Sequence, residues 1–272
     1  MQIITLVENT TLSDTYRSKH GLSLYIETKN HKILFDLGPN KTFLENAKKL
    51  SVDIAKVDTL IISHGHIDHC GALEIFLKEN KTATIYAQES VFDGYFTKVL
   101  GIPFKVGVSK PDKIDRFKFV DKILRIDDEL LILADIKGKE LISLSNKALY
   151  RKVNNNLVED DFHHEQSLII CEEGKYTLIA GCAHKGIVNI QNSAESILDK
   201  KIDYIISGFH LFNPVVRKYE KDKLIQELGD RLAKNNTKYF TCHCTGDKAF
   251  KILKDKMRDK IDYISTGSEI LI

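Results

Sequence analysis

Short apolar runs alternate with polar turns and amphipathic stretches along most of the chain. Branched and aromatic side chains dominate these runs, which favours β-strands. In the first half we expect strands at Gln2 to Val7, Leu22 to Glu27, Lys32 to Phe35, Thr59 to Ile62 and Thr84 to Ala87. In the second half we expect them at Ser167 to Cys171, Tyr176 to Ala180, Tyr204 to Ser207, Tyr239 to Thr241, Tyr263 to Ser265 and Glu269 to Ile272.

Amphipathic segments of helix length follow several of these strands. Phe43, Leu44, Ala47 and Leu50 recur at helical spacing and predict a helix from Lys41 to Leu50. Further helices are expected at Ala72 to Lys78, Glu89 to Tyr95, after His184, at Tyr219 to Asn235 and at Asp247 to Met257. Both halves begin with paired strands and continue with strand-helix units. This rhythm predicts an α/β fold of two packed sheets with helices on the outer faces.

The segment at about 97 to 162 breaks this rhythm, because its apolar pieces are short and are separated by charged turns. We therefore expect a single domain over residues 1 to 272 that carries a loop-rich insertion at about 97 to 162. Such a segment could form a lid or a substrate wall, and a peripheral β-subdomain is an equal alternative.

Composition narrows the function classes. A formal net charge of +2 with 29% charged residues, and no long basic tract, gives no reason to expect a nucleic-acid partner. No signal peptide pattern and no apolar run of about 18 residues is present, so we expect a cytoplasmic protein without a membrane partner. Five cysteines without a Cys-x-x-Cys pair indicate reduced thiols. The sequence leaves the oligomeric state open.

The densest group of reactive side chains follows the strand at Thr59 to Ile62. His64, His66, Asp68 and His69 lie within six residues, and such groups are costly to bury unless they share a partner such as a divalent cation. Residues two apart point the same way in an extended segment, so His64 and His66 can reach one ion while Asp68 and His69 face a neighbouring position. The spacing therefore predicts two adjacent metal ions.

Three further histidines follow predicted strands, where α/β folds collect their ligands. His184 and His243 are expected to bind metal, and direct ligation by Cys182 is the alternative to a packing role for this thiol. For His210, metal ligation, substrate contact and orientation of a neighbouring ligand are open alternatives. Lys185 and the free N–H groups of the following helix could hold an anion such as a phosphate.

The remaining polar candidates have supporting roles. Asp36 ends a buried strand, and its carboxylate could orient the metal loop or a ligating imidazole without touching the metal. His20 and His31 lie in polar turns and are expected to be solvated. His163 and His164 precede a strand, and the sequence assigns them no role.

Asp36-Leu37-Gly38 followed by His64-Gly65-His66-Ile67-Asp68-His69 resembles the motif pair of the metallo-β-lactamase superfamily. Gly-Cys-Ala-His at 181 to 184, Gly-Phe-His-Leu at 208 to 211 and His-Cys-Thr-Gly at 243 to 246 resemble the branch that contains 7,8-dihydropterin-6-ylmethyl-4-(β-D-ribofuranosyl)aminobenzene 5'-phosphate synthase. The resemblance implies a four-layer αββα sandwich, with two mixed sheets and two metal ions at one edge.

Two positions bear on the metals that the resemblance implies. Many members of the superfamily carry a Gly-Asp pair whose carboxylate bridges the two metals, where this chain has Gly181-Cys182. A bridge through Cys182, a bridge through hydroxide alone, and a single tightly bound metal are the alternatives. Oxygen-reducing di-iron relatives place a glutamate where this chain has His66, which favours zinc, with manganese or iron as alternatives.

These features predict a metal-dependent hydrolase that uses a metal-activated water on a phosphate- or pyrophosphate-bearing small molecule. Asp68 could accept a proton while it ligates, and His210 or Lys185 could stabilise charge on the leaving oxygen. The alternative, implied by the resemblance, is a transferase that condenses a dihydropterin pyrophosphate with an arylamine ribofuranosyl phosphate. A nuclease and a non-catalytic metal-binding protein are less favoured.

Overall fold

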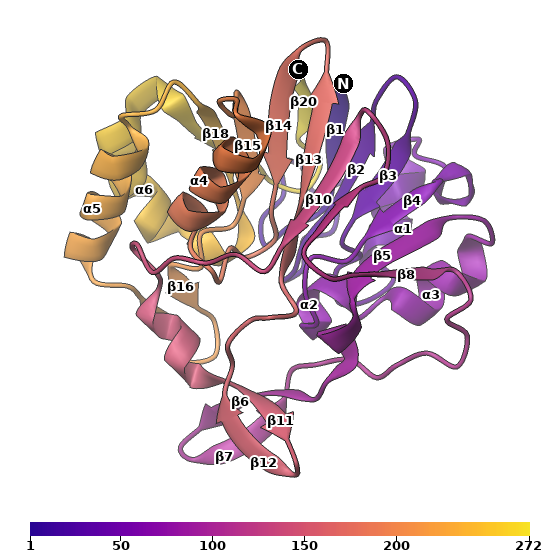
Figure 1. Cartoon of the computed structure of the whole chain (residues 1–272), viewed down its shortest axis with the longest axis horizontal. Helices are drawn as coiled ribbons and strands as arrows, with labels where there is room; N and C mark the ends of the chain where they lie inside the picture. Colours follow the sequence, from indigo (N-terminus) through magenta and orange to yellow (C-terminus); the bar gives the residue numbers. More distant parts are fainter.

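Two seven-stranded mixed sheets pack face to face at the centre of the molecule (Figure 1). The computed structural model describes all 272 residues. In spatial order, the first sheet contains β20 (Glu269–Leu271), β1 (Gln2–Val7), β2 (Ser23–Glu27), β3 (Lys32–Phe35), β4 (Thr59–Ile61), β5 (Thr84–Gln88) and β8 (Phe117–Val120). The second contains β19 (Ile261–Tyr263), β18 (Lys238–Thr241), β15 (Tyr204–Ser207), β14 (Lys175–Ile179), β13 (Gln166–Glu172), β10 (Leu130–Ala134) and β9 (Ile123–Arg125).

Helices cover the outer face of each sheet. The first sheet is covered by α1 (Thr42–Lys49) and α3 (Leu73–Glu79), and the short α2 (Ile67–Cys70) follows β4. The second sheet is covered by α4 (Ile187–Leu198), α5 (Asp222–Leu232) and α6 (Asp247–Met257). Single 3₁₀ turns lie at Ile54–Lys56, Glu89–Phe92, Leu144–Ala148, His243–Thr245 and Arg258–Lys260. The predicted four-layer αββα sandwich is confirmed.

Side-chain alternation explains why the central strands are apolar along their whole length. On β4, Leu60 belongs to the cluster that packs against α1 and α3, whereas Ile61 belongs to the cluster between the two sheets. Successive residues of a strand point to opposite faces, and both faces of these sheets are covered. The strands β4, β14, β15 and β18 each run into a loop that carries metal-competent side chains.

The segment at about 97 to 162 is not one peripheral insertion, which corrects the expectation from the sequence. Its strand β8 pairs with β5 in the first sheet, and β9 and β10 complete the second sheet. All five residues of β10 are buried, because this short apolar run packs between the sheets and the outer helices. Only a four-stranded sheet projects from the body (Figure 1), formed by β12 (Asn156–Glu159), β11 (Leu149–Val153), β6 (Tyr95–Val99) and β7 (Ile102–Lys105).

Two predicted helices are shorter in the structure. The expected helix at Glu89 to Tyr95 is a single 3₁₀ turn, because the chain enters β6 at Tyr95. The expected helix at Tyr219 to Asn235 begins only at Asp222, because β17 (Lys218–Tyr219) pairs with β16 (Phe212–Asn213). No helix combines the length and the apolar character needed to cross a bilayer.

Candidate metal centre

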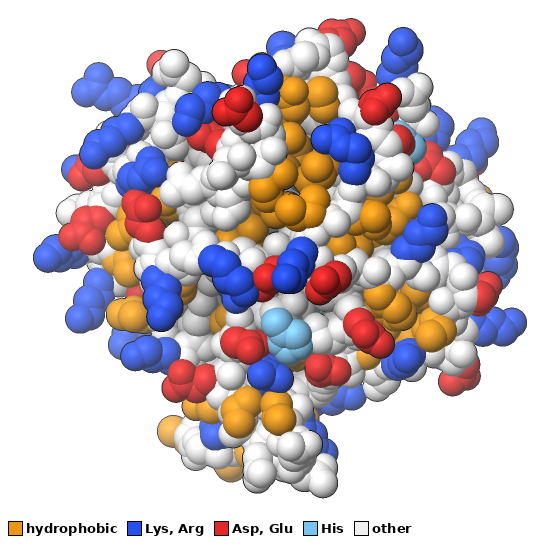
Figure 2. Space-filling model, viewed as in Figure 1, with side chains coloured by type: hydrophobic (Ala, Val, Ile, Leu, Met, Phe, Trp, Pro, Cys, Tyr) orange, Lys and Arg blue, Asp and Glu red, His pale blue; other side chains and the backbone are white.

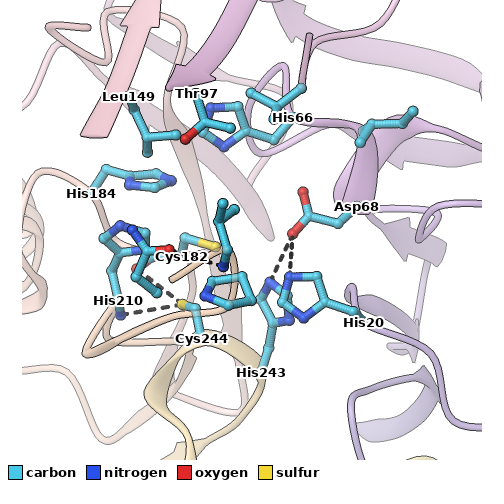
Figure 3. Close-up of a pocket in the computed structure, with 15 residues that line it drawn as sticks. His20, His66, Asp68, Thr97, Leu149, Cys182, His184, His210, His243 and Cys244 are labelled. Carbon is cyan, nitrogen blue, oxygen red and sulfur yellow. Dashed lines mark hydrogen bonds and ion pairs between the residues drawn. The ribbon is translucent and has the colours of Figure 1, made fainter. Parts of the chain in front are cut away.

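The loop after β4 and the start of α2 carry His66 and Asp68 to a cavity at one edge of the sandwich (Figure 3). His64 and His69 are fully buried, and His66 is nearly so. Gly65 lets the loop pass beneath its neighbours, because a Cβ there would lie 2.3 Å from the carbonyl oxygen of Val91. The backbone between His64 and His66 therefore packs closely against the neighbouring chain.

One donor group consists of His64, His66 and His184, whose ring nitrogens lie within 4.8 Å of one another. All three Nε2 atoms are buried without a hydrogen-bond partner. Burial among other histidines lowers the pKa of His64 and His184 well below the ordinary value and that of His66 to about 3. The three imidazoles are therefore neutral at physiological pH.

Hydrogen bonds at Nδ1 decide which ring nitrogen carries the proton. The Ser63 hydroxyl donates to Asp36, 2.6 Å away, so its oxygen accepts from Nδ1–H of His64 at 2.8 Å. Nδ1 of His184 lies 3.0 Å from Oδ1 of Asn146, which only accepts. The Nε2 lone pairs of His64 and His184 thus remain free to bind a cation.

A second donor group surrounds Asp68. Its Oδ2 lies 3.3 Å from Nε2 of His243 and 3.9 Å from Nε2 of His69, and these two nitrogens are 3.2 Å apart. Sγ of Cys182 is 3.2 Å from Nε2 of His69. Donors held about 2.1 Å from a tetrahedral cation are separated by roughly 3.4 Å. The spacing of these four residues therefore fits a second cation.

Charge favours cation binding at this second group. Burial disfavours ionised Asp68, but His69 and the contacts from His20 and His243 lower the pKa of this carboxyl well below its usual value. Burial also opposes protonation of His69, yet Asp36 and Asp68 raise its pKa above the ordinary value. Asp68 is therefore ionised at neutral pH.

Asp36 and Asn9 orient the histidines of the second group from behind. Asp36 is fully buried, accepts from Nδ1–H of His69 at 2.7 Å and accepts from the backbone N–H of Ser63 at 2.8 Å. Oδ1 of Asn9 accepts from Nδ1–H of His243 at 2.9 Å. Both histidines thus direct Nε2 toward the carboxylate of Asp68.

His164 has no place in the cavity and instead holds the metal loop. Its Nδ1 accepts from the backbone N–H of Gly65 at 2.9 Å, and its Nε2 lies 3.1 Å from Oδ2 of Asp160. Because Nδ1 accepts, the proton is on Nε2 and is donated to Asp160. The ring stacks on Tyr95 with centroids 3.9 Å apart. Sequence reasoning assigned His164 no role, since the contact joins residues that are 99 positions apart.

His210 reaches the cavity from the loop after β15. Its side chain is buried, and neither ring nitrogen has a hydrogen-bond partner. The ring lies 4.2 Å from the ring of His184, and the backbone N–H donates to Sγ of Cys244 at 3.2 Å. His210 therefore offers free polar atoms beside the first donor group.

Lys185 does not line the cavity, in contrast to the expectation from the sequence. The backbone N–H groups of His184 and Lys185 are also not free, because they donate to the carboxylate of Glu165 at 2.7 and 2.9 Å. Burial raises the pKa of Glu165 to about 7, although these hydrogen bonds oppose the shift. An internal carboxylate thus occupies the two N–H groups that precede the helix α4, which begins at Ile187.

Sequence reasoning missed two side chains that line the cavity, His20 and Cys244. His20 is exposed as expected, with 40% of its side chain accessible, but its Nε2 also lies 3.3 Å from Oδ2 of Asp68. Burial disfavours the Cys244 thiolate, but contacts with Cys182 and His210 lower the pKa of this thiol well below its usual value. Burial raises the pKa of Cys182 well above the ordinary value. Cys182 lies two residues before His184 and Cys244 directly follows His243, and these patterns alone did not predict that the pKa values of the two thiols shift in opposite directions.

The cavity has a volume of about 180 Å³ and two kinds of wall. Metal-competent side chains surround the cavity from several sides, and Leu149 lies beside His184 (Figure 3). Apolar side chains line much of the rest. They come from α2, from the four-stranded sheet and the residue that follows its strand β7, and from the loop after β16, namely Ile67, Leu149, Val106, Pro214 and Val215. A ligand with a polar end and an apolar body would match this division.

Known proteins resemble the chain in sequence and in structure. The sequence model of the metallo-beta-lactamase superfamily matches residues 18–139. The chain is 27% identical to the 7,8-dihydropterin-6-methyl-4-(beta-D-ribofuranosyl)-aminobenzene-5'-phosphate synthase of Methanocaldococcus jannaschii, over 99% of this chain and 96% of that protein. Tm1679, a metal-dependent hydrolase of the beta-lactamase superfamily, superposes with a TM-score of 0.84 and 25% identity, over 100% of this chain and 99% of Tm1679. YhfI from Bacillus subtilis shares the fold, with a TM-score of 0.54 at 10% identity, over 99% of each chain.

Proposed function

We propose that the chain is a two-metal enzyme of the metallo-β-lactamase superfamily, whose members generally bind divalent metals, and that it acts on a phosphate- or pyrophosphate-bearing small molecule. One observation carries this proposal. Nε2 of His64, His66 and His184 are buried side by side without partners, which is costly unless a cation binds them.

In this proposal each donor group holds one cation. His64, His66 and His184 bind the first, and Asp68, His69 and His243 bind the second with Cys182 beside them. Imidazole and thiolate donors at these spacings suit zinc, and manganese or iron are the alternatives. Cys182 is 3.2 Å from His69 and shares donor groups with His64 and with His184, so it is the candidate bridging ligand.

Hydrolysis is the proposed chemistry. Bound cations would lower the pKa of a water molecule and polarise a phosphoryl oxygen. In the reaction, the oxygen of water bonds to phosphorus, the bond from phosphorus to the leaving oxygen breaks, and the leaving oxygen takes up a proton. Asp68 accepts the proton of the attacking water, and a free ring nitrogen of His210 donates a hydrogen bond to the leaving oxygen. Lys185 is not part of this proposal, because it lies outside the cavity.

Group transfer is the second candidate function. It is favoured by the 27% identity to the methanogen synthase, which extends over 99% of this chain. Here the nitrogen of an arylamine ribofuranosyl phosphate would bond to the methylene carbon of a dihydropterin pyrophosphate. The bond from this carbon to the pyrophosphate oxygen would break, pyrophosphate would leave, and the nitrogen would lose a proton. The apolar wall around Leu149 and Val215 could receive an aromatic acceptor and keep water out.

One experiment tests both candidates. Purified protein is loaded with zinc, manganese or iron, incubated with the pterin pyrophosphate alone or with the arylamine, and the products are identified by mass spectrometry. Release of phosphate or pyrophosphate without a condensed product supports hydrolysis, and a condensed product supports transfer. Product formation that persists unchanged after chelation would refute a metal-dependent reaction.

A nuclease is less favoured. On the face in Figure 2, basic and acidic side chains are interspersed rather than gathered into a basic track. The whole chain carries a formal net charge of only +2, whereas nucleic-acid binding relies on clustered positive charge.

A further inference from the structure

We propose that His20 is a ligand of the cation beside Asp68, so that the N-terminal loop completes the second metal position. This inference rests on the proposed two-cation site and adds a residue to it. His20 lies between β1 and β2, far in sequence from the metal loop. Figure 3 shows its ring beside that of His243, with both rings directed at the carboxylate of Asp68.

The distances match ligands around a cation better than a hydrogen-bonded ion pair. Nε2 of His20 lies 3.3 Å from Oδ2 of Asp68, which equals the distance from Nε2 of His243 to the same oxygen. Hydrogen bonds from nitrogen to a charged oxygen are shorter, at about 2.7 to 2.9 Å. Neighbouring ligands of a tetrahedral cation are roughly 3.4 Å apart. The donor atoms of these three residues all lie within 4.8 Å of one another.

The backbone around His20 is built to hold the ring in this position. Gly21 has φ of +144°, and a Cβ there would lie 2.3 Å from the carbonyl oxygen of Asp68. The backbone N–H of Leu22 donates to this same oxygen at 3.2 Å. The chain on the C-terminal side of His20 is thus fixed against the backbone of Asp68.

Asn9 contacts both the segment around His20 and the side chain of His243. Its Oδ1 accepts both from the backbone N–H of Gly21, at 3.2 Å, and from Nδ1 of His243, at 2.9 Å. One side chain therefore holds the residue that follows His20 and also directs Nε2 of His243. Such shared support is expected where two side chains bind one ion.

The test compares His20→Ala with a matched surface variant. His163 has nearly the same side-chain exposure as His20, 38% against 40%, and it also pairs with an aspartate, but it lies outside the cavity. We expect wild type and His163→Ala to bind two zinc ions, measured by titration against a coloured chelator. His20→Ala should retain the first ion and bind the second at least about tenfold more weakly, since even indirect support of a ligand has an effect of that size.

A second measurement uses the wild-type protein and does not depend on how the variant folds. With ¹⁵N-labelled histidine and ¹¹³Cd²⁺, Nε2 of His20 should show scalar coupling to cadmium once two ions are bound. Two ions of unchanged affinity in His20→Ala, or no coupling at His20 in the loaded wild type, would overturn the role of His20. Wild type that binds no ion would instead overturn the proposed function itself, so the two failures are distinguishable.

Discussion

His164 offers the sharpest test of how the fold supports the proposed site, because its two ring nitrogens have different tasks. Nδ1 accepts from Gly65 in the metal loop, and Nε2 donates to Asp160. Asparagine places its side-chain oxygen close to the position of Nδ1, whereas the glutamine amide reaches as far as Nε2. His164→Asn therefore keeps the contact with the loop, and His164→Gln keeps only the contact with Asp160.

The expected loss in His164→Gln follows from the freed N–H of Gly65. A buried donor without an acceptor costs about 1 to 3 kcal/mol. The loop can relieve this cost by turning the N–H toward water, which moves the adjacent His64 and His66. Cation binding must then reverse the movement, so the cost becomes a loss of affinity. Because each 1.4 kcal/mol corresponds to a tenfold change in affinity, we expect zinc affinity to fall by about 5-fold to 150-fold.

Both variants lose the ring that stacks on Tyr95, so both should be less stable than wild type. Thermal melting of the metal-free proteins measures this shared effect, and chelator competition measures zinc affinity. His164→Asn should bind zinc nearly as wild type does, although it lacks the contact with Asp160. Equal zinc affinities in the two variants would refute a positioning role for the contact with Gly65.

Three further outcomes are expected. Asp36→Asn weakens the charged contact with Nδ1 of His69, so cation affinity should fall by about 10- to 100-fold in chelator competition, and unchanged affinity would contradict this role. Lys185→Ala should keep kcat/KM within about twofold, as it lies outside the cavity, and a hundredfold loss in steady-state kinetics would return it to the mechanism. As pH falls from about 8 to 5, the cation beside His69 should leave first. The pKa of His69 is raised, so a proton competes with the cation for its Nε2, whereas the pKa of His66 is lowered to about 3. Metal analysis after dialysis at each pH measures the order of loss, and simultaneous loss of both cations would contradict this prediction.

The sequence alone determined the layers and the metal loop, because both depend on local patterns. Runs of branched and aromatic residues located most central strands to within one or two residues, and helical spacing located α1 and α6. The expected pieces of the segment at about 97 to 162 were too short to reveal which sheet each would join. Which sheet a strand such as β10 joins depends on where both of its apolar faces can be buried between the layers.

Tertiary structure decided which polar side chains meet. His20 reaches Asp68 through a glycine turn, and His164 reaches Gly65 from 99 residues away. Lys185 was predicted to bind an anion, but it lies outside the cavity, and its backbone N–H donates to the buried carboxylate of Glu165. Spacing along the chain predicts which side chains lie together at the end of one strand or on one face of a helix. Contacts between distant loops depend on packing, and packing is fixed only when the two sheets close on each other.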